Sequence, residues 1–365
     1  MPESKDIEKW IRPELFTFGG YSAATSPETL AGKIEVPVDK ILKLDANENP
    51  YGCSPRVNRA LSEYSLYNTY PDDGQENLRK LLATYTGVDT SNIVAGNGSN
   101  QLIDLILRLL INKGDEVINI VPTFGIYSFS TNLCGGTLVN IDRDDKFNID
   151  IDMVKKAITG KTKIIMLANP NNPTGNLMPR KQIIELLNTG LPVLVDEAYY
   201  EFSQDTVAPL IADYGNLMVL RTFSKWAGLA GLRVGYGIFP AVITDYLLRT
   251  KIPYNVNVAA LVAVKESFED IDFLKETIEK IIAERERLFE QLQTLEWLKP
   301  FPSRANFILC RVLKGNAKEL HSQLRNKGIL IRYFEQPRLK DCIRISVGKP
   351  EHTDAIMKAL RETGG

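Results

Sequence analysis

Short runs of apolar residues recur along the chain from about residue 90 onwards, separated by stretches with helical spacing. Several runs are continuously apolar rather than alternating, which is typical of strands buried on both faces of a sheet. The predicted strands lie at 92–95, 117–121, 137–141, 163–168, 193–195, 218–220 and 234–239, with helices predicted between many of them at 101–111, 151–158 and 180–188. This alternation predicts an α/β fold with a mostly parallel central sheet flanked by helices.

The pattern changes at both ends of the chain. Residues 1–40 contain several glycines and prolines and show little periodicity, so we expect an N-terminal arm. We assign residues 41–254 to a large cofactor-binding α/β domain. Residues 255–365 begin with a long charged helical stretch and continue with short strands and helices, which predicts a smaller α+β domain. Packing of the N-terminal arm against the smaller domain is an alternative that the sequence does not decide.

Composition narrows the classes of function. Hydrophobic residues make up 44% of the 365 residues, and 44 Lys and Arg balance 45 Asp and Glu. A chain so close to neutral has no overall attraction to nucleic acid or to anionic membranes, and we expect neither as a partner. The charged segment 1–9 has no secretory apolar region, and no apolar run is long enough to span a membrane. The four cysteines are scattered and there are only two histidines, so we expect a cytoplasmic protein without a metal site.

A glycine-rich segment follows the first predicted strand, at the edge where open α/β sheets bind ligands. The sequence Gly-Asn-Gly-Ser-Asn at 96–100 allows a tight turn, and the helix that follows offers free N–H groups to an anion such as phosphate. The alternative is a tight turn in which Ser99 or Asn100 caps the helix. Gln101 stands where a dinucleotide-binding motif would have its third glycine, which argues against such a motif.

Two further polar segments follow buried strands. Asn-Pro-Asn-Asn-Pro-Thr-Gly at 169–175 comes directly after the strand at 163–168, and its prolines stiffen a turn that could aim an amide at a ligand. The strand at 193–195 leads into Asp196, a carboxylate that is costly to bury without a cation, and Tyr199 can reach the same place. The alternatives are a proline-rich loop without a ligand and an ordinary acid that caps a loop.

The fourth segment spans residues 221–233 and contains a candidate catalytic lysine, Lys225. Lys225 lies between small polar and aromatic residues, beside a glycine-rich loop. A lysine that is removed from water and placed near a second cation has a lowered pKa and becomes a nucleophilic amine. Thr222, Ser224 and Arg233 could share one anion. A surface lysine is the alternative.

The order of these four segments is more specific than any one of them. Gly-Ser-Asn, Asn-Pro-Thr-Gly, Asp-Glu-Ala-Tyr and Ser-Lys…Arg resemble, in this order, the motifs of fold-type I pyridoxal-phosphate (PLP) aminotransferases, over about residues 40–348. The resemblance implies PLP as cofactor, held covalently by Lys225, which would also transfer the proton in the reaction. It implies that Asp196 pairs with the pyridinium nitrogen. Asn172 and Tyr199 would then hydrogen-bond to the phenolic oxygen.

The same resemblance assigns the remaining contacts to the cofactor. Phe124 would stack on the face of the ring, although simple core packing would suit the same position. Tyr70 matches a tyrosine that reaches the phosphate from the neighbouring subunit, which implies a homodimer with shared active sites. The phosphate would be held by Gly98, Ser99, Asn100, Thr222, Ser224 and Arg233.

Within the class-II aminotransferase family, the histidinol-phosphate aminotransferases are the most similar, through segments 44–52, 70–74, 230–237 and 343–348. This implies conversion of L-histidinol phosphate and 2-oxoglutarate to imidazole acetol phosphate and L-glutamate, a step of histidine biosynthesis. One pocket must then accept a phosphate and afterwards a carboxylate. Arg344 and Arg332 are the candidates, because a guanidinium group binds either oxyanion bidentately. For each arginine a surface ion pair is the alternative. Asn47 and Tyr21 would line the substrate pocket.

Other functions remain open on the same motifs. An aromatic amino-acid aminotransferase and a PLP-dependent threonine-phosphate decarboxylase would share the scaffold. A PLP-binding transcription regulator would need a helix-turn-helix of about 60 residues ahead of the sheet, where only the aperiodic arm stands. Turnover of histidinol phosphate, phenylalanine and threonine phosphate would separate the enzymatic alternatives.

Overall fold

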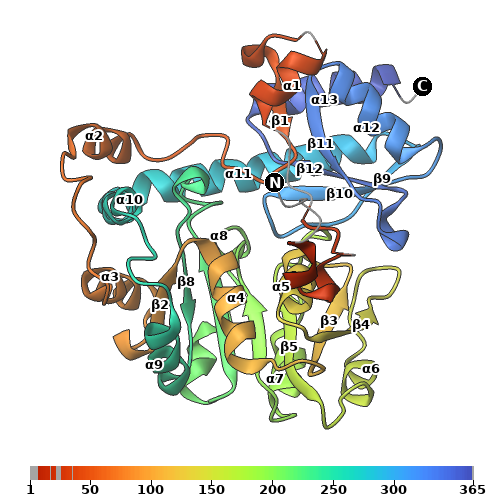
Figure 1. Cartoon of the computed structure of the whole chain (residues 1–365). Coiled ribbons are helices and arrows are strands. Elements are labelled where there is room, and N and C mark those ends of the chain that lie inside the picture. The colour runs from red at the N-terminus through yellow and green to blue at the C-terminus, as the bar shows by residue number, and fades with distance from the viewer. Residues whose placement is uncertain (1–6, 17, 22–25, 35, 364–365) are drawn as a thin grey trace.

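Two separate sheets organise the molecule in the computed structural model, which describes residues 7–16, 18–21, 26–34 and 36–363 (Figure 1). The larger sheet has seven strands in the order β2-β8-β7-β6-β5-β3-β4. Only β8 runs antiparallel to its neighbours β2 and β7. The predicted mostly parallel sheet is therefore confirmed. Its strands are β2 (Ile93–Gly96), β3 (Glu116–Val121), β4 (Thr137–Asp142), β5 (Thr162–Ala168), β6 (Val193–Asp196), β7 (Leu217–Thr222) and β8 (Gly235–Ile238).

Helices cover both faces of the larger sheet (Figure 1). Because successive side chains of a strand point to opposite faces, Val193 and Val195 join one apolar core and Leu194 joins the other. This explains why the strands are apolar without alternation. The helices outside the smaller sheet are α2 (Pro55–Glu63), α3 (Glu76–Thr86), α4 (Gly98–Leu110), α5 (Ile126–Leu133), α6 (Ile151–Lys156), α7 (Arg180–Leu187), α8 (Tyr200–Ser203), α9 (Ala241–Thr250) and α10 (Val258–Glu269).

The smaller sheet has five strands in the order β1-β11-β12-β10-β9, with a core of its own. Its first strand, β1 (Leu42–Leu44), pairs in parallel with β11 (Ile329–Tyr333). Residues 42–44 were predicted to belong to the larger domain, but they extend the smaller sheet. The remaining elements are β9 (Leu298–Pro300), β10 (Phe307–Val312), β12 (Cys342–Ser346), α12 (Ala317–Asn326) and α13 (Pro350–Thr363).

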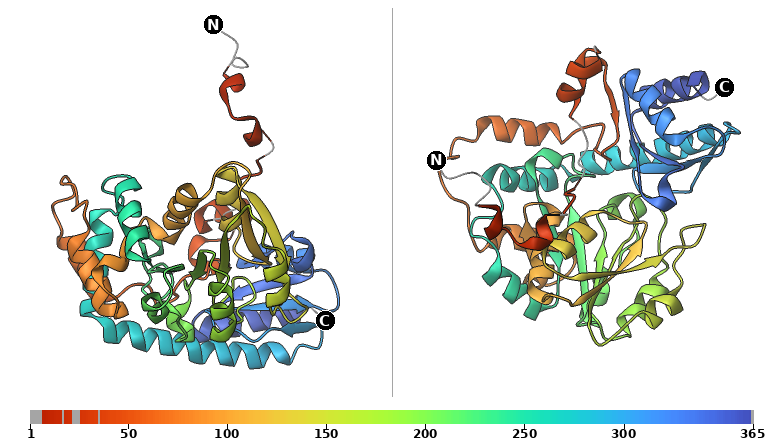
Figure 2. Two further views of the ribbon diagram at one scale, coloured as in Figure 1. Left: turned by 90° about the horizontal axis from the view of Figure 1, so that it is seen from below. Right: turned by 45° about the vertical axis from the view of Figure 1, so that its right-hand side comes forward.

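A long helix, α11 (Ile271–Gln293), joins the two parts (Figure 2). Leu274 and Ile281 in its first half belong to the core of the larger sheet, whereas Leu288 and Leu292 in its second half belong to the core of the smaller one. The helix therefore holds the two sheets in one arrangement. No described helix is long and apolar enough to cross a membrane.

The arm divides between the two parts of the molecule. Its first segment contains the 3-10 helices η2 (Glu8–Trp10) and η3 (Pro13–Leu15), and it lies against α5 through a hydrogen bond of 2.9 Å from Arg12 Nη2 to the Leu133 carbonyl. The second segment, with α1 (Pro27–Ile34) and η4 (Val38–Lys40), leads into β1, the edge strand of the smaller sheet (Figure 1). Further 3-10 helices are η5 (Thr90–Asn92), η6 (Ala208–Ala212), η7 (Ala230–Leu232) and η8 (Pro337–Leu339).

Candidate active site

A cavity of about 930 Å³ lies at the C-terminal ends of the parallel strands and extends to the smaller sheet. Ala168 and Asp196, at the ends of β5 and β6, line it from one side, and Arg332 and Arg344 on β11 and β12 line it from the other. Strand ends of an open α/β sheet are the usual place for a ligand. The cavity is therefore the candidate active site.

One end of the cavity is built to hold an anion. The first turn of α4 presents free N–H groups, and Ser99 and Asn100 line the cavity there. Thr222 Oγ1 donates to Ser224 Oγ at 3.0 Å, and Arg233 Nη1 donates to the same oxygen at 3.4 Å. Hydroxyls, a guanidinium group and a helix N-terminus in one place favour a phosphate.

A glycine is required beside this anion site. Gly98 has a φ of +70°, and a Cβ atom there would overlap the guanidinium group of Arg233. Any larger residue would thus displace a cation of the anion site as well as strain the backbone. Gly98 itself does not line the cavity, but it allows Arg233 to reach it.

Asp196 supplies a buried carboxylate to the middle of the cavity. Its side chain is 3% exposed, its Oδ2 accepts a hydrogen bond of 2.8 Å from the Tyr127 hydroxyl, and its Oδ1 accepts one of 3.1 Å from the Ala198 N–H. Burial raises the pKa of Asp196 to about 6, although these two hydrogen bonds oppose the rise. A cationic ring nitrogen at this point would offset the cost of burial.

Lys225 brings an amine into the same cavity. Its Nζ donates to the Ala46 carbonyl at 2.9 Å. Burial, together with the positive charges of Arg344 and Arg233, lowers the pKa of Lys225 to about 8, against the opposing effect of Glu48. At pH 8 about half of this amine is neutral, whereas an ordinary lysine with a pKa near 10.4 is almost fully protonated. The group is thus suited to nucleophilic attack and to proton transfer.

Two arginines mark the side of the cavity formed by the smaller sheet. Arg332 on β11 and Arg344 on β12 are directly opposed in the antiparallel register. Arg344 Nη1 donates to Asn172 Oδ1 and its Nη2 donates to the Asp45 carbonyl, each at 2.6 Å. Burial lowers the pKa of Arg344 to about 10. Two neighbouring guanidinium groups at a cavity wall suit an anionic ligand.

Aromatic and amide groups complete the walls. Phe124 lines the cavity and meets Tyr21 of the arm edge-on, with ring centroids 6.3 Å apart. Asn47 Nδ2 donates to the Tyr199 hydroxyl at 2.9 Å, and Asn47 has a φ of 55°. The arm therefore contributes a wall of the site through Tyr21.

An ion pair behind the strand ends holds β6 and β7 together. Glu197 and Arg221 follow and precede the cavity residues Asp196 and Thr222, so their side chains point to the opposite face of the sheet. Glu197 Oε2 accepts from Arg221 Nε at 3.0 Å and from Nη2 at 2.9 Å, with both side chains at most 3% exposed. The pair thereby fixes the spacing between the carboxylate and the anion site.

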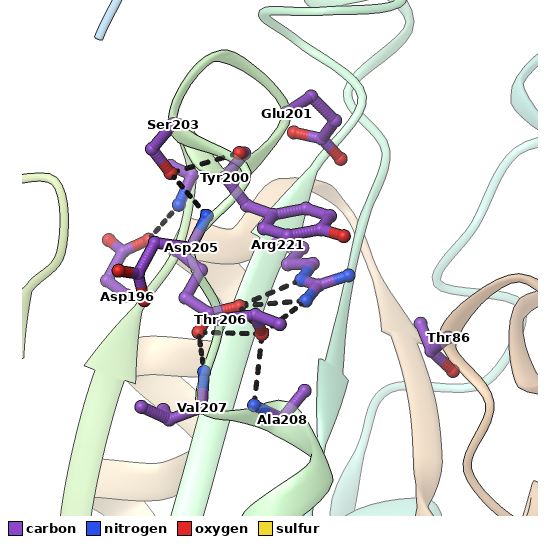
Figure 3. Close-up of polar contacts among 12 residues, drawn as sticks. Thr86, Asp196, Tyr200, Glu201, Ser203, Asp205, Thr206, Val207, Ala208 and Arg221 are labelled. Carbon is purple, nitrogen blue, oxygen red and sulfur yellow. Dashed lines mark hydrogen bonds and ion pairs between the residues drawn. The ribbon is translucent and has the colours of Figure 1, made fainter. Parts of the chain in front are cut away.

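A loop adds further bonds to this pair. Thr206 Oγ1 accepts from Arg221 Nη2 at 2.7 Å, and the Val207 N–H donates to Glu197 Oε1 at 2.7 Å (Figure 3). The ring of Tyr200 lies 3.6 Å from the guanidinium carbon of Arg221. Nearby, burial raises the pKa of Glu201 to about 8.

The structure gathers most of the residues predicted for the site, while their roles stay predictions. The two exceptions are Gly98, described above, and Tyr70, which is 79% exposed and stacks on Tyr254 with ring centroids 4.5 Å apart. The predicted residues that line the cavity are Tyr21, Asn47, Ser99, Asn100, Phe124, Asn172, Asp196, Tyr199, Thr222, Ser224, Lys225, Arg233, Arg332 and Arg344.

Several residues that contribute to the site were not predicted from the sequence. Tyr127 had no predicted role, although it lies only three residues after Phe124. Asp45 and Glu48 line the cavity, and their acidic charge among arginines was not anticipated. In the segment 169–175 only Asn172 and Pro173 reach the cavity. Asn171 instead binds the Pro122 carbonyl and Thr174, which holds the loop in shape.

The chain matches one protein family over almost its whole length. The model of the family "Aminotransferase class I and II" matches residues 39–361. The chain belongs to this aminotransferase family. A histidinol-phosphate aminotransferase of Dehalococcoides mccartyi is 52% identical over 359 residues, covering 98% of this chain and 99% of the relative. The chloroplastic histidinol-phosphate aminotransferase of Nicotiana tabacum is 41% identical and covers 97% of this chain and 86% of the relative.

Solved structures agree with the family. The histidinol-phosphate aminotransferase of Sinorhizobium meliloti, solved in complex with pyridoxal 5'-phosphate, superposes with a TM-score of 0.87 at 27% identity and 96% coverage of both chains. Aminotransferases of this family work with pyridoxal phosphate. The described residues of this aminotransferase fit that group: an anion site for its phosphate, a buried carboxylate for its ring nitrogen and a reactive amine for its aldehyde carbon.

Proposed function

We propose that this aminotransferase converts L-histidinol phosphate and 2-oxoglutarate to imidazole acetol phosphate and L-glutamate, a step of histidine biosynthesis. The observation that carries the proposal is the 52% identity, over nearly the full length of both chains, to an enzyme of that name. The opposed pair Arg332 and Arg344 supports it, because both line the cavity where a second phosphate would lie. This substrate needs such a site in addition to the anion site at α4.

The residues of the cavity have different proposed roles toward the cofactor. When bound, pyridoxal phosphate supplies an electron sink that stabilises negative charge at the substrate Cα. We propose that Asp196 would hold a positive charge at the ring nitrogen. Lys225 Nζ would take the proton from the substrate Cα and deliver it to C4′ of the cofactor, the carbon that carried the aldehyde. Thr222, Ser224 and Arg233 hold the phosphate, and Phe124 covers the ring.

One binding place must serve two substrates in turn. Arg344 is buried and held by Asn172 and by the Asp45 carbonyl, so its planar group is pre-oriented toward the cavity. A guanidinium group can bind the phosphate of histidinol phosphate and afterwards a carboxylate of 2-oxoglutarate with the same geometry. We propose Asn47 and Tyr21 as further walls for the substrate.

The proposed substrate is tested by comparing amino donors. We expect kcat/KM to be highest with histidinol phosphate, and at least about a hundredfold lower with histidinol, because the arginines then lose their charge-assisted bonds. Glutamate formation and the spectrum of the bound cofactor in a single turnover measure the reaction. Equal or faster turnover of phenylalanine would identify an aromatic aminotransferase instead. Release of CO₂ from threonine phosphate would identify a decarboxylase.

We also propose a homodimer in which Tyr70 serves the partner's site. Tyr70 lies outside the cavity of its own chain and is 79% exposed. Exposed apolar side chains are close to Tyr70 or to its stacking partner Tyr254 along the chain: Leu66 is 56% exposed, Tyr67 54% and Ile252 66%. Several exposed large apolar side chains in neighbouring segments are typical of an interface.

Subunit mixing tests the shared site. Lys225→Ala and Tyr70→Ala each disable the sites that contain the changed residue, but a mixed dimer has one site with both original residues. Half of the dimers would be mixed, so we expect about a quarter of the original activity after mixing. Tyr246→Ala, which removes an exposed tyrosine on α9, should keep full activity by itself. Activity that equals only the sum of the two variants would refute the shared site.

The cysteines support the expected cytoplasmic location, which stays a proposal. Cys53, Cys134, Cys310 and Cys342 are all free. Unpaired cysteines are usual in a reducing compartment.

A further inference from the structure

Tyr127 contacts the carboxylate of Asp196 from outside the cavity. Its side chain is fully buried, and its hydroxyl donates to Asp196 Oδ2 at 2.8 Å. It lies on α5, three residues after Phe124, and the two rings meet edge-on with centroids 5.8 Å apart. The turn that leads into α5, in which the Tyr127 N–H donates to the Phe124 carbonyl at 3.2 Å, therefore delivers both the aromatic wall of the cavity and a donor to Asp196.

Apolar packing alone does not explain a tyrosine here. The ring belongs to an apolar core that also contains Met166 and Leu194. Phenylalanine would fill that space without a polar atom, whereas a buried hydroxyl is costly unless it is hydrogen-bonded. The partner that satisfies the Tyr127 hydroxyl is Asp196. Burial and the negative charge of Asp196 raise the pKa of Tyr127 well above 10, so the hydroxyl keeps its proton and remains a donor.

The hydroxyl completes the support of the carboxylate. Asp196 Oδ1 accepts from the Ala198 N–H and Oδ2 accepts from Tyr127, so both oxygens are anchored while the group still lines the cavity. Each bond favours the charged form and opposes the effect of burial. The two hydrogen bonds thereby fix the orientation of the carboxylate and favour its charged form.

We propose that Tyr127 is a positioning residue that keeps Asp196 ionised and aimed at the ring nitrogen of the cofactor. The inference rests on the proposed role of pyridoxal phosphate in this cavity. It adds a residue that does not touch the cofactor but sets how strongly the protein holds the ring nitrogen in its positively charged form.

Other titratable and charged groups near Tyr127 and Asp196 also affect the pKa values of these two residues. Glu197 raises the pKa of Asp196 and Lys225 lowers it. Tyr199 and Arg143 act in opposite directions on the pKa of Tyr127, which Tyr199 raises and Arg143 lowers. Removing the Tyr127 hydroxyl leaves these groups in place, so the change isolates one hydrogen bond.

Cofactor affinity, rather than turnover, tests the role. In Tyr127→Phe we expect the affinity for pyridoxal phosphate to fall about tenfold, the usual effect of losing a hydrogen bond to a charged group. The loss should grow as the pH falls from 8.5 to 6, because the pKa of Asp196 rises further and its charge is lost at a higher pH. Equilibrium dialysis at several pH values measures both effects.

A cofactor analogue separates positioning from structure. The deaza analogue of pyridoxal phosphate has carbon in place of the ring nitrogen, so Tyr127→Phe should leave its affinity unchanged. Tyr85→Phe is the matched control, since Tyr85 is a largely buried tyrosine whose hydroxyl donates to Glu201, outside the cavity. It should change neither affinity. In a protein that already carries Asp196→Asn, adding Tyr127→Phe should cause no further loss of affinity for pyridoxal phosphate.

The outcomes are distinct. An equal loss of affinity for both compounds in Tyr127→Phe would show a structural role, and an unchanged affinity for pyridoxal phosphate would show no role; either overturns the inference. No binding of pyridoxal phosphate to the unchanged protein would overturn the proposed cofactor instead. The measurement uses no amino donor, so a wrong substrate assignment would leave its result intact.

Discussion

Replacing Lys225 by alanine should lower turnover by at least about ten-thousand-fold, at the upper end of what one acid–base group contributes. Lys225 provides the amine of the cavity, with its Nζ bonded to the Ala46 carbonyl. In the proposed mechanism its loss removes the group that takes the proton from the substrate and holds the cofactor covalently. Single-turnover absorbance with histidinol phosphate measures the loss. Lys163→Ala, on β5 at the surface, is the matched control and should keep full activity.

The pH dependence gives a second readout of the same residue. Because the pKa of Lys225 is lowered to about 8, the cofactor-free protein should attach pyridoxal phosphate faster as the pH rises through about 8. An ordinary lysine would show this rise above pH 10. Turnover by a Lys225→Ala protein saturated with cofactor, or a rise only above pH 10 in the unchanged protein, would contradict the assignment.

Replacing Glu197 by alanine should destabilise the cofactor-free protein by about 3–5 kcal/mol, since it leaves a buried guanidinium group without its carboxylate. Glu197 binds Arg221, Thr206 and the Val207 N–H, and it is fully buried. The free energy of unfolding in urea measures the loss. Cofactor must be absent, because its binding would add stability.

A surface pair provides the control for this prediction. Glu185 pairs with Lys155 at 2.9 Å, but the two side chains are 37% and 38% exposed. Glu185→Ala should therefore cost at most about 1 kcal/mol. Replacing Glu197 and Arg221 together by leucine and methionine should recover much of the stability, because no buried charge is then left unpaired. Similar losses for Glu185→Ala and Glu197→Ala would show that burial of the pair is not what matters.

The strands and most of the cavity residues were predictable because they depend on local pattern. A continuously apolar run followed by a polar segment identifies both a buried strand and its C-terminal end. The ends of parallel strands meet at one edge, so Asp196 and Lys225 had to lie near each other once the sheet formed. The mostly parallel sheet follows from the same alternation of strands and helices.

Contacts between distant segments were not predictable in this way. β1 pairs with β11, which lies almost 300 residues later in the chain (~42 against ~329). The three residues of β1 show no pattern from which this pairing could be predicted. The same holds for the hydrogen bonds from Arg344 to Asn172 and from Asn47 to Tyr199. Tyr127 could have been noticed from its spacing to Phe124, but its acceptor depends on how α5 packs against β6.

By itself, the sequence determined the α/β fold, the order of its motifs and most of the residue types that line the cavity. These properties are local, because side-chain period, strand ends and helix starts are set within a few residues. Only the tertiary structure decided how the cavity is closed and supported. Tyr21 and the smaller sheet form its other walls, Tyr127 donates to Asp196, the Glu197–Arg221 pair joins β6 to β7, and Tyr70 lies outside the cavity of its own chain. Those facts depend on contacts between segments far apart in the chain, whose energies arise only when the sheets and helices are in place.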